Sequence, residues 1–341
     1  MTTGRAIGVS ACARATARGA ILAAARGAAR TAALAVALAA ALAPSPAFAQ
    51  AWVPSARQGS VTVAFQVIEN TGHVLTDGST IPLGKSRDAS IYLETDYAIT
   101  DRFSVVAGVP FVFAKYLGPP PPPGMPEPPM VRGVDACYCW QQGWADFGFT
   151  ARYNLFNGAG ALTPSVSYGL PSHDYVYRGE AVVGRHLKEL RLAVDAGLRL
   201  DAISPRLAVQ GRYSYGWVEQ VLDVPNNRSN VTAEALFQAT DRLQVRGGAY
   251  RQITHGGLRL GTQGPTMPDG YPWGEATTPA LFAEHDRLLR DNYWHLGAGF
   301  SFFFAWADVF ASYVEFVGGT DTHAGRAFTT GLSVPFGRPR P

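Results

Sequence analysis

Polar and apolar residues alternate along most of the chain, in stretches of about ten residues that each end at a turn. Within 89–99, Glu94 and Asp96 fall on one face, whereas Leu93 and Tyr97 fall on the other. Such a period of two is typical of a β-strand, because successive side chains of a strand point to opposite faces. The chain is therefore expected to form a sheet with one apolar and one polar face.

About twelve segments share this pattern, and each is close to the ~9–11 residues that a tilted membrane strand needs. They are 60–69, 88–99, 103–114, 144–156, 162–171, 188–200, 206–218, 229–239, 243–254, 292–304, 307–317 and 327–336. After residue 50 no run of about 20 apolar residues occurs, so a helical membrane span is not expected there. The pattern predicts an all-β chain.

The connections between these segments alternate in length. Short turns are expected at 100–102, 157–161, 201–205, 240–242 and 305–306, and longer loops at 70–87, 115–143, 172–187, 219–228, 255–291 and 318–326. This alternation is typical of a transmembrane antiparallel up-and-down β-barrel with both termini on the periplasmic side and long external loops. Prolines 119–123 make the loop 115–143 unsuitable for a central strand, because proline donates no ladder hydrogen bond.

Aromatic residues favour a membrane barrel over its main alternative, a soluble β-sandwich or barrel. Interfacial girdles place Tyr and Trp near strand ends. The candidates for such girdles are Tyr92, Tyr97, Trp144, Tyr153, Tyr213, Tyr215, Trp217 and Trp294. The partner expected around them is outer-membrane lipid.

Residues 1–49 differ from the rest of the chain. They hold five arginines and no acidic residue, an apolar run at 31–43, and then Ala47-Phe48-Ala49. These features predict a secretory signal peptide that is cleaved after Ala49, leaving a barrel at 50–341. The alternative, an anchoring helix, is disfavoured because the run is too short. Removing the five arginines turns the formal net charge of +3 into −2, so nucleic-acid binding is not expected.

Three segments resemble a known family. They are 96–111 (DYAITDRFSVVAGVPF), 143–155 (GWADFGFTARYNL) and 164–171. Their order is similar to that of the outer-membrane porin-like transporters named for the meta-pathway of phenol degradation. The resemblance implies a channel or transporter in the bacterial outer membrane for small solutes, including aromatic or hydrophobic ones. One departure is that residues 337–341 follow the final aromatic strand, whose end the barrel-assembly machinery commonly reads.

The polar faces provide the candidate functional residues, because charges inside an apolar-walled barrel need water or each other. The predicted lumen-lining residues are Glu94, Asp96, Asp146, Arg152, Arg191, Asp195, Arg199, Gln210, Arg212, Glu234, Gln244 and Arg246. They favour a hydrated pore that takes a small-molecule solute. Two alternatives remain: a barrel plugged by salt bridges, and a structural or adhesive barrel whose loops 115–143 and 255–291 bind a partner without transport.

An enzyme is the competing class. His295 and Ser301 share a strand, as in a barrel phospholipase, but a separation of six residues places them about 20 Å apart. We therefore expect no catalytic residues, no cofactor and no metal, since His255, His285 and Asp286 in one loop have no specific ligand spacing. In an exported protein, Cys137 and Cys139 are expected to form a small disulfide.

Overall fold

The structure is a computed structural model that describes residues 51–118, 137–262 and 274–337. The predicted signal peptide, its cleavage site and the proline run lie outside these residues. Twelve long strands are present: β1 (Gly59–Val74), β3 (Ser86–Ala98), β4 (Phe103–Tyr116), β6 (Phe147–Tyr153), β8 (Gly160–Leu170), β9 (Glu189–Arg199), β10 (Leu207–Val218), β11 (Asn226–Gln238), β12 (Leu243–Gly256), β13 (Asn292–Phe303), β14 (Asp308–Thr320) and β15 (Thr322–Phe336).

The minor elements lie in the connections. They are β2 (Thr80–Ile81), β5 (Gln141–Trp144), β7 (Phe156–Asn157), the helix α2 (Pro279–Ala283) and the 3-10 helix η1 (Asp286–Leu288). Among the described residues, neither the length nor the hydropathy of any helix suffices to span a membrane.

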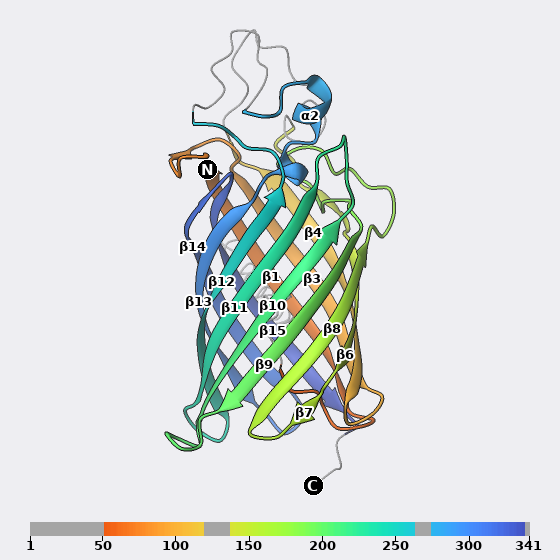
Figure 1. Cartoon of the computed structure of the whole chain (residues 1–341), viewed down its shortest axis with the longest axis vertical. Coiled ribbons are helices and arrows are strands. Elements are labelled where there is room, and N and C mark those ends of the chain that lie inside the picture. The colour runs from red at the N-terminus through yellow and green to blue at the C-terminus, as the bar shows by residue number, and fades with distance from the viewer. Residues whose placement is uncertain (1–50, 119–136, 263–273, 338–341) are drawn as a thin grey trace, which may run out of the picture. The chain divides into compact units, whose positions relative to one another are not determined.

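The strands form one antiparallel sheet that closes into a barrel (Figure 1). Neighbours along the chain pair with one another from β3 to β15, and β15 then pairs with β1 in a ladder that begins at Gly59 opposite Phe336. Closure is completed between β1 and β3, where the Arg57 amide donates to the Ala98 carbonyl at 2.7 Å. The predicted twelve-stranded up-and-down barrel is confirmed.

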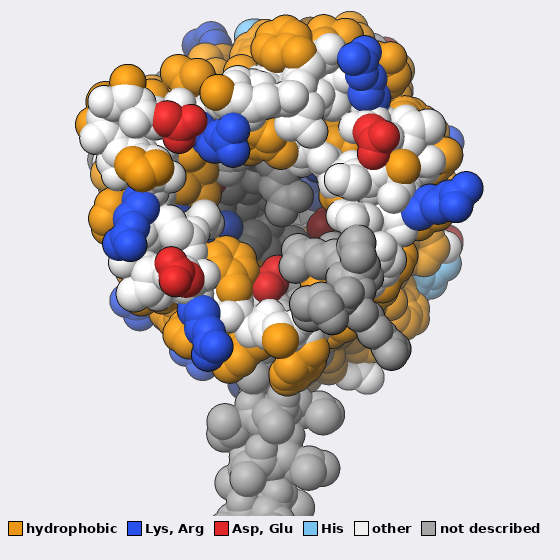
Figure 2. All heavy atoms as spheres, turned by 90° about the horizontal axis from the view of Figure 1, so that it is seen from below, with side chains coloured by type: hydrophobic (Ala, Val, Ile, Leu, Met, Phe, Trp, Pro, Cys, Tyr) orange, Lys and Arg blue, Asp and Glu red, His pale blue; other side chains and the backbone are white. Residues whose placement is uncertain are grey.

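The outer face of the barrel is apolar. Along β9, the side chains of Leu192, Val194 and Leu198 are exposed although each sits in the middle of a sheet. Exposed apolar side chains continue around the barrel surface (Figure 2). Since a closed barrel satisfies every backbone ladder internally, such a surface is suited to the hydrocarbon of a bilayer.

Aromatic residues follow both rims of this apolar face. Exposed rings near the short-turn end belong to Tyr97, Tyr153, Phe304, Trp306 and Phe336, and those near the long-loop end to Trp144, Tyr168, Trp217 and Trp294. One girdle prediction is wrong. Tyr92 lines the interior, because it shares the even-numbered face of β3 with Glu94.

Two hairpins use the same turn chemistry. In the β3–β4 turn, the Thr100 hydroxyl accepts from the Phe103 amide at 3.0 Å, and Thr240 accepts from the Leu243 amide at 3.0 Å in the β11–β12 turn. A threonine whose hydroxyl accepts a hydrogen bond from the backbone amide three residues later stabilises such a turn. The repeated Thr-Asp-Arg sequence thus has a local physical cause.

One connection differs from its prediction. The expected loop 318–326 is a sharp reversal between β14 and β15 at Asp321, whose φ is +54°. The Thr76 hydroxyl donates to the Asp321 carboxylate at 2.5 Å, and the Leu260 amide donates to it at 2.9 Å. Aspartate tolerates the left-handed conformation better than most residues, so the strands extend further than alternation alone indicates.

Three of the other long connections, 70–87, 219–228 and 255–291, meet in an apolar cap at the long-loop end (Figure 1). Its buried core comprises Leu75, Leu258, Leu260, Ala276, Phe282, Leu288 and Leu289. The helix α2 in this cap begins at Thr278, whose hydroxyl accepts from the Leu281 amide at 3.2 Å. The loops therefore have a hydrophobic core of their own, separate from the barrel wall.

Candidate functional site: the barrel lumen

The lumen is a cavity of about 1210 Å³ to which all twelve long strands contribute side chains. Seen from the short-turn end, the molecule is hollowed at its centre, inside a rim that carries apolar, basic and acidic side chains (Figure 2). The cavity exists because alternation sends one face of every strand inward. Its lining decides what the barrel can bind or pass.

The structure places ten of the twelve predicted lumen residues in the cavity lining: Glu94, Asp96, Asp146, Arg152, Arg191, Arg199, Gln210, Arg212, Gln244 and Arg246. The other two, Asp195 and Glu234, are buried in the same wall. Each contacts a lining arginine: Asp195 lies 3.5 Å from Arg212, and Glu234 lies 3.9 Å from Arg246.

Most of these charges are paired, either between neighbouring strands or, as for Arg152 and Asp96, across the strand β4 that lies between β6 and β3. Arg152 of β6 reaches Asp96 of β3 at 2.5 Å and donates to the Ser104 hydroxyl at 3.0 Å. On the adjoining wall, the Gln210 amide donates to the Glu234 carboxylate at 2.5 Å. Paired charges cost less to bury than isolated ones, so this network lowers the cost of a polar interior.

Sequence reasoning missed a further group at the upper part of the same wall. Glu189 of β9 accepts a hydrogen bond from Arg191 at 2.6 Å and lies 3.7 Å from Arg228 of β11. Glu189 also lines the cavity. The sequence did contain a signal for Glu189, because residues 189, 191 and 195 lie on the same face of β9. The predicted inward face had not been extended to the start of that strand.

The charges are concentrated on one side of the lumen. On the strands β13, β14, β15 and β1, the lining residues are His295, Ser301, Phe303, Phe310, Val314, Ser333, Ser60, Thr62 and Gln66, with Tyr293 and Gly297. Asp308 is the one acidic lining residue of these four strands among the described residues. One wall is thus rich in ionic groups, whereas the opposite wall has Asp308 as its single acidic lining residue among the described residues and carries aromatic rings.

The segment before β1 enters the lumen at the short-turn end. Ala51 is fully buried, and its carbonyl accepts from the Thr163 hydroxyl at 2.5 Å. Trp52 lines the cavity, and its indole donates to the Gly158 carbonyl at 3.4 Å. Close approach here depends on Gly197, since a Cβ at that position would lie 2.5 Å from the Trp52 ring. This segment narrows that end of the lumen.

Polar contacts hold the loops against the mouth of the lumen, the end at which the long loops lie. Tyr175 donates a hydrogen bond to the Asp146 carboxylate, and the same hydroxyl accepts from the His186 amide at 2.8 Å. Arg185 lies 3.7 Å from Asp291, and burial lowers the pKa of Arg185 to about 10. The cap is therefore held over the mouth by ionic and polar contacts as well as by its apolar core.

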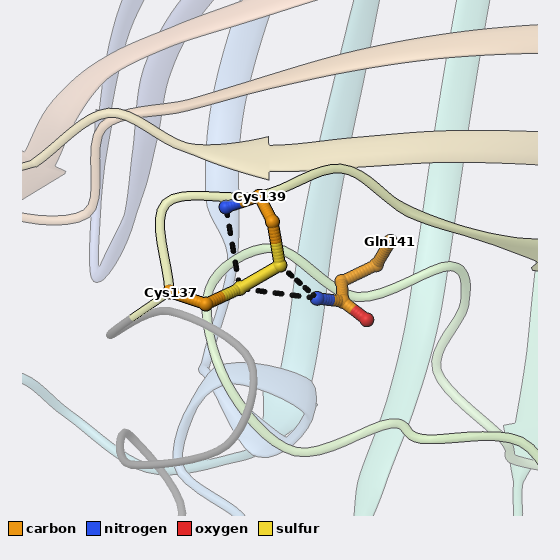
Figure 3. The surroundings of a disulfide bond; sticks show 3 residues. All are labelled: Cys137, Cys139 and Gln141. Atoms are coloured by element: carbon orange, nitrogen blue, oxygen red, sulfur yellow. Dashed lines mark hydrogen bonds between the residues drawn. A yellow bond between two sulfur atoms is a disulfide. The ribbon is translucent and has the colours of Figure 1, made fainter.

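A disulfide joins Cys137 and Cys139 in the connection before β5, where the Gln141 amide donates to the Cys139 sulfur at 3.2 Å (Figure 3). Neither cysteine lines the cavity. The bridge closes a small ring, which restricts the backbone locally.

The residues considered for catalysis face the lumen. His295 and Ser301 both line the cavity from β13, as their shared parity requires. His295 lies among aromatic rings, and its ring is tilted against that of Tyr293 with the two centroids 4.6 Å apart. No contact between His295 and Ser301 occurs in the described part of the chain.

Comparison with known proteins bears on the fold. No protein-family model and no curated relative matches the sequence. The structure is similar to that of an outer membrane channel from Pseudomonas putida F1, with a TM-score of 0.62, 13% identity, and coverage of 86% of this chain and 100% of that chain. This similarity establishes the shared barrel fold.

Other barrels are more distant. The KdgM porin in complex with disordered oligogalacturonate has a TM-score of 0.41 and 8% identity, covering 81% of this chain and 98% of that chain. LpxR from Salmonella typhimurium has a TM-score of 0.42 and 9% identity, covering 80% and 99% respectively. These values carry no functional argument. The resemblance to the phenol meta-pathway family stays a prediction.

Proposed function

We propose that this protein is an outer-membrane channel for small amphipathic solutes, such as aromatic carboxylates. The observation that carries the proposal is the two-sided lumen, in which an arginine-containing ionic wall faces a wall that is mostly uncharged and includes Phe303, Phe310 and Tyr293. An aromatic anion presents a charged end and an apolar ring, and each would meet a matching surface. The volume of about 1210 Å³ exceeds that of ordinary small-ligand pockets, which supports passage of a single-ring solute.

The polar lining favours a channel over a solid plug. Paired side chains such as Arg152 and Asp96 leave a cavity of about 1210 Å³ rather than filling the barrel. Arg191 retains 36% side-chain exposure beside its partner Glu189 and is available to an anion. In a narrow lumen with low-dielectric walls, such fixed charges act strongly on a passing ion.

Planar-bilayer recording of the refolded full-length chain tests the proposal. We expect discrete conductance steps that benzoate blocks at lower concentration than acetate does. Arg191→Gln should weaken the benzoate block, whereas Arg326→Gln, which removes an arginine from the outer face, should leave it unchanged. Equal block by benzoate and acetate would reject the amphipathic selectivity.

A barrel whose loops bind a partner without transport is the second candidate function. The observation that favours it is the loop cap, which has its own apolar core at Leu258, Leu260 and Leu288. Absence of conductance both in the intact chain and in Trp52→Ala, which clears the other end of the lumen, would support this candidate and overturn the channel.

A further inference from the structure

Imidazole and carboxylate groups from four distant segments converge where the loop cap meets the barrel. His73 belongs to β1, Glu180 to the β8–β9 loop, His285 and Asp286 to the β12–β13 loop, and His323 to β15. The ligand atoms that His73, Glu180, His285 and Asp286 offer all lie within 4.8 Å of one another. We name these four residues and His323 the mouth cluster.

We propose that the mouth cluster is a binding site for one divalent transition-metal ion of the zinc class. Nitrogen from imidazole and oxygen from carboxylate are the donors that such ions take in proteins. The site lies outside the lumen lining, and its existence is independent of whether the barrel conducts.

The distances suit a single ion. His73 Nε2 lies 3.3 Å from Glu180 Oε1 and 3.6 Å from Asp286 Oδ1, and His285 Nε2 lies 3.7 Å from that same Oδ1. With metal–ligand bonds of 2.0–2.1 Å, adjacent donors of a tetrahedral site are about 3.3 Å apart, and opposite donors of a higher-coordinate site about 4.2 Å. The observed separations therefore need only small side-chain movements around a central ion.

The ring of His285 is oriented as a metal ligand. Its Nδ1 lies 2.6 Å from the Phe282 carbonyl oxygen. A carbonyl only accepts, so Nδ1 carries the proton and the lone pair of the neutral ring lies on Nε2, which faces Asp286. Metal-binding histidines commonly fix their free nitrogen in this way by donating from the other one.

The surroundings also confine the donor atoms. His73 is fully buried, and a side chain at Gly84 would collide with its ring. Asp286 Oδ1, which lies 3.6 Å from His73 Nε2, is buried as well. An oxygen donor and a confined imidazole thus face one another in a partly enclosed site.

His323 completes the cluster on the barrel side. Its Nε2 lies 3.2 Å from Glu180 Oε2 and 3.8 Å from Asp286 Oδ1, and its ring centroid is 4.4 Å from that of His73. An ion bound here would cross-link two loops to adjacent strands of the wall. More than a hundred residues separate His73 from Glu180 and Glu180 from His285, so metal binding would stabilise the closed cap against opening.

Zinc titration of the refolded full-length protein tests the proposal directly. We expect about one Zn²⁺ per chain by calorimetry and elemental analysis, an increased thermal midpoint with Zn²⁺, and no comparable effect of Mg²⁺. His285→Ala and Asp286→Asn should each weaken zinc binding by more than about tenfold and abolish the thermal shift. His173→Ala, which removes an exposed imidazole from the loop that carries Glu180, is the matched control and should bind as the native chain does.

Heat-modifiable migration on gels should show that each variant has folded, and Glu180→Gln supplies a third, nearly isosteric change. Zinc binding that persists unchanged in folded His285→Ala and Asp286→Asn would overturn the proposal. So would a native chain that shows neither zinc retention nor a thermal shift, since the cluster would then be only a network of ion pairs.

Discussion

The buried pair between Arg152 and Asp96 allows the energetics of the lumen wall to be tested. Arg152→Met keeps most of the side-chain volume but removes the guanidinium that lies 2.5 Å from the Asp96 carboxylate. It also removes the donor to the Ser104 hydroxyl. Both partners of the pair are nearly buried, at 6% and 8% exposure for Arg152 and Asp96, so water replaces the lost contacts only in part.

The expected cost follows from that burial. Removing one partner of a buried ion pair typically costs 3–5 kcal/mol, and access to the hydrated cavity argues for the lower end, about 3 kcal/mol. The double variant Arg152→Met with Asp96→Leu should recover most of this loss, because no unpaired charge is left. By contrast, Arg199 and Asp201 form a pair whose side chains are more than half exposed, so Asp201→Asn should cost less than about 1 kcal/mol.

Urea unfolding of the refolded barrel, followed by tryptophan fluorescence, measures these differences. A double-mutant cycle then separates the coupling of Arg152 and Asp96 from the cost of each single change. The reasoning fails if Arg152→Met is no more destabilising than Asp201→Asn, or if the double variant is less stable than either single variant. Either result would mean that water already solvates the Asp96 carboxylate in the folded native protein.

Three further perturbations address the two ends and the outer face. Trp52→Ala should increase single-channel conductance without changing barrel migration on gels, because the indole lines the cavity; unchanged conductance would show that Trp52 does not restrict the pore. Gly197→Val should give the same increase, since a Cβ there would lie 2.5 Å from the Trp52 ring and 2.8 Å from the Ala51 Cβ; a decrease would show that the new side chain itself blocks the lumen. Val194→Arg, in the middle of the lipid-facing side of β9, should cost about 2–4 kcal/mol in unfolding experiments, whereas Leu198→Arg near the strand end should cost about 0–1 kcal/mol. Equal costs for those two arginines would contradict the assigned position of the bilayer.

The barrel wall could be predicted from the sequence because short stretches of neighbouring residues determine it. A period of two fixes which side chains face inward, and threonine turns such as that at Thr100 fix where the chain reverses. Each strand therefore reveals its own inner face, and Glu94, Arg152 and Arg212 could be assigned from alternation alone. Tyr92 shows that residue type is a weaker guide than alternation. It was assigned to the girdle as an aromatic residue near a strand end, although alternation along its strand places it on the inward face with Glu94.

The ends of the barrel were not predictable in the same way. The insertion of Ala51 and Trp52 depends on the missing side chain of Gly197, which is about 145 residues away. No periodicity marks such a contact. The cap likewise joins Leu75 to Leu258 and Leu288, and a sequence pattern does not reveal which loops share a core.

The position of His73 shows how one local irregularity changes a site. Even-numbered residues of β1 such as Thr62 and Gln66 line the cavity, so simple alternation directs residue 73 outward, towards lipid. A register shift between Asn70 and Gly72 inserts one extra residue against β15 and reverses this parity. His73 consequently pairs with His323 and turns inward to the mouth cluster, where it is fully buried. The bulge thus converts an otherwise lipid-facing imidazole into a partner for Glu180 and Asp286, so the proposed metal site depends on a backbone feature that alternation cannot encode.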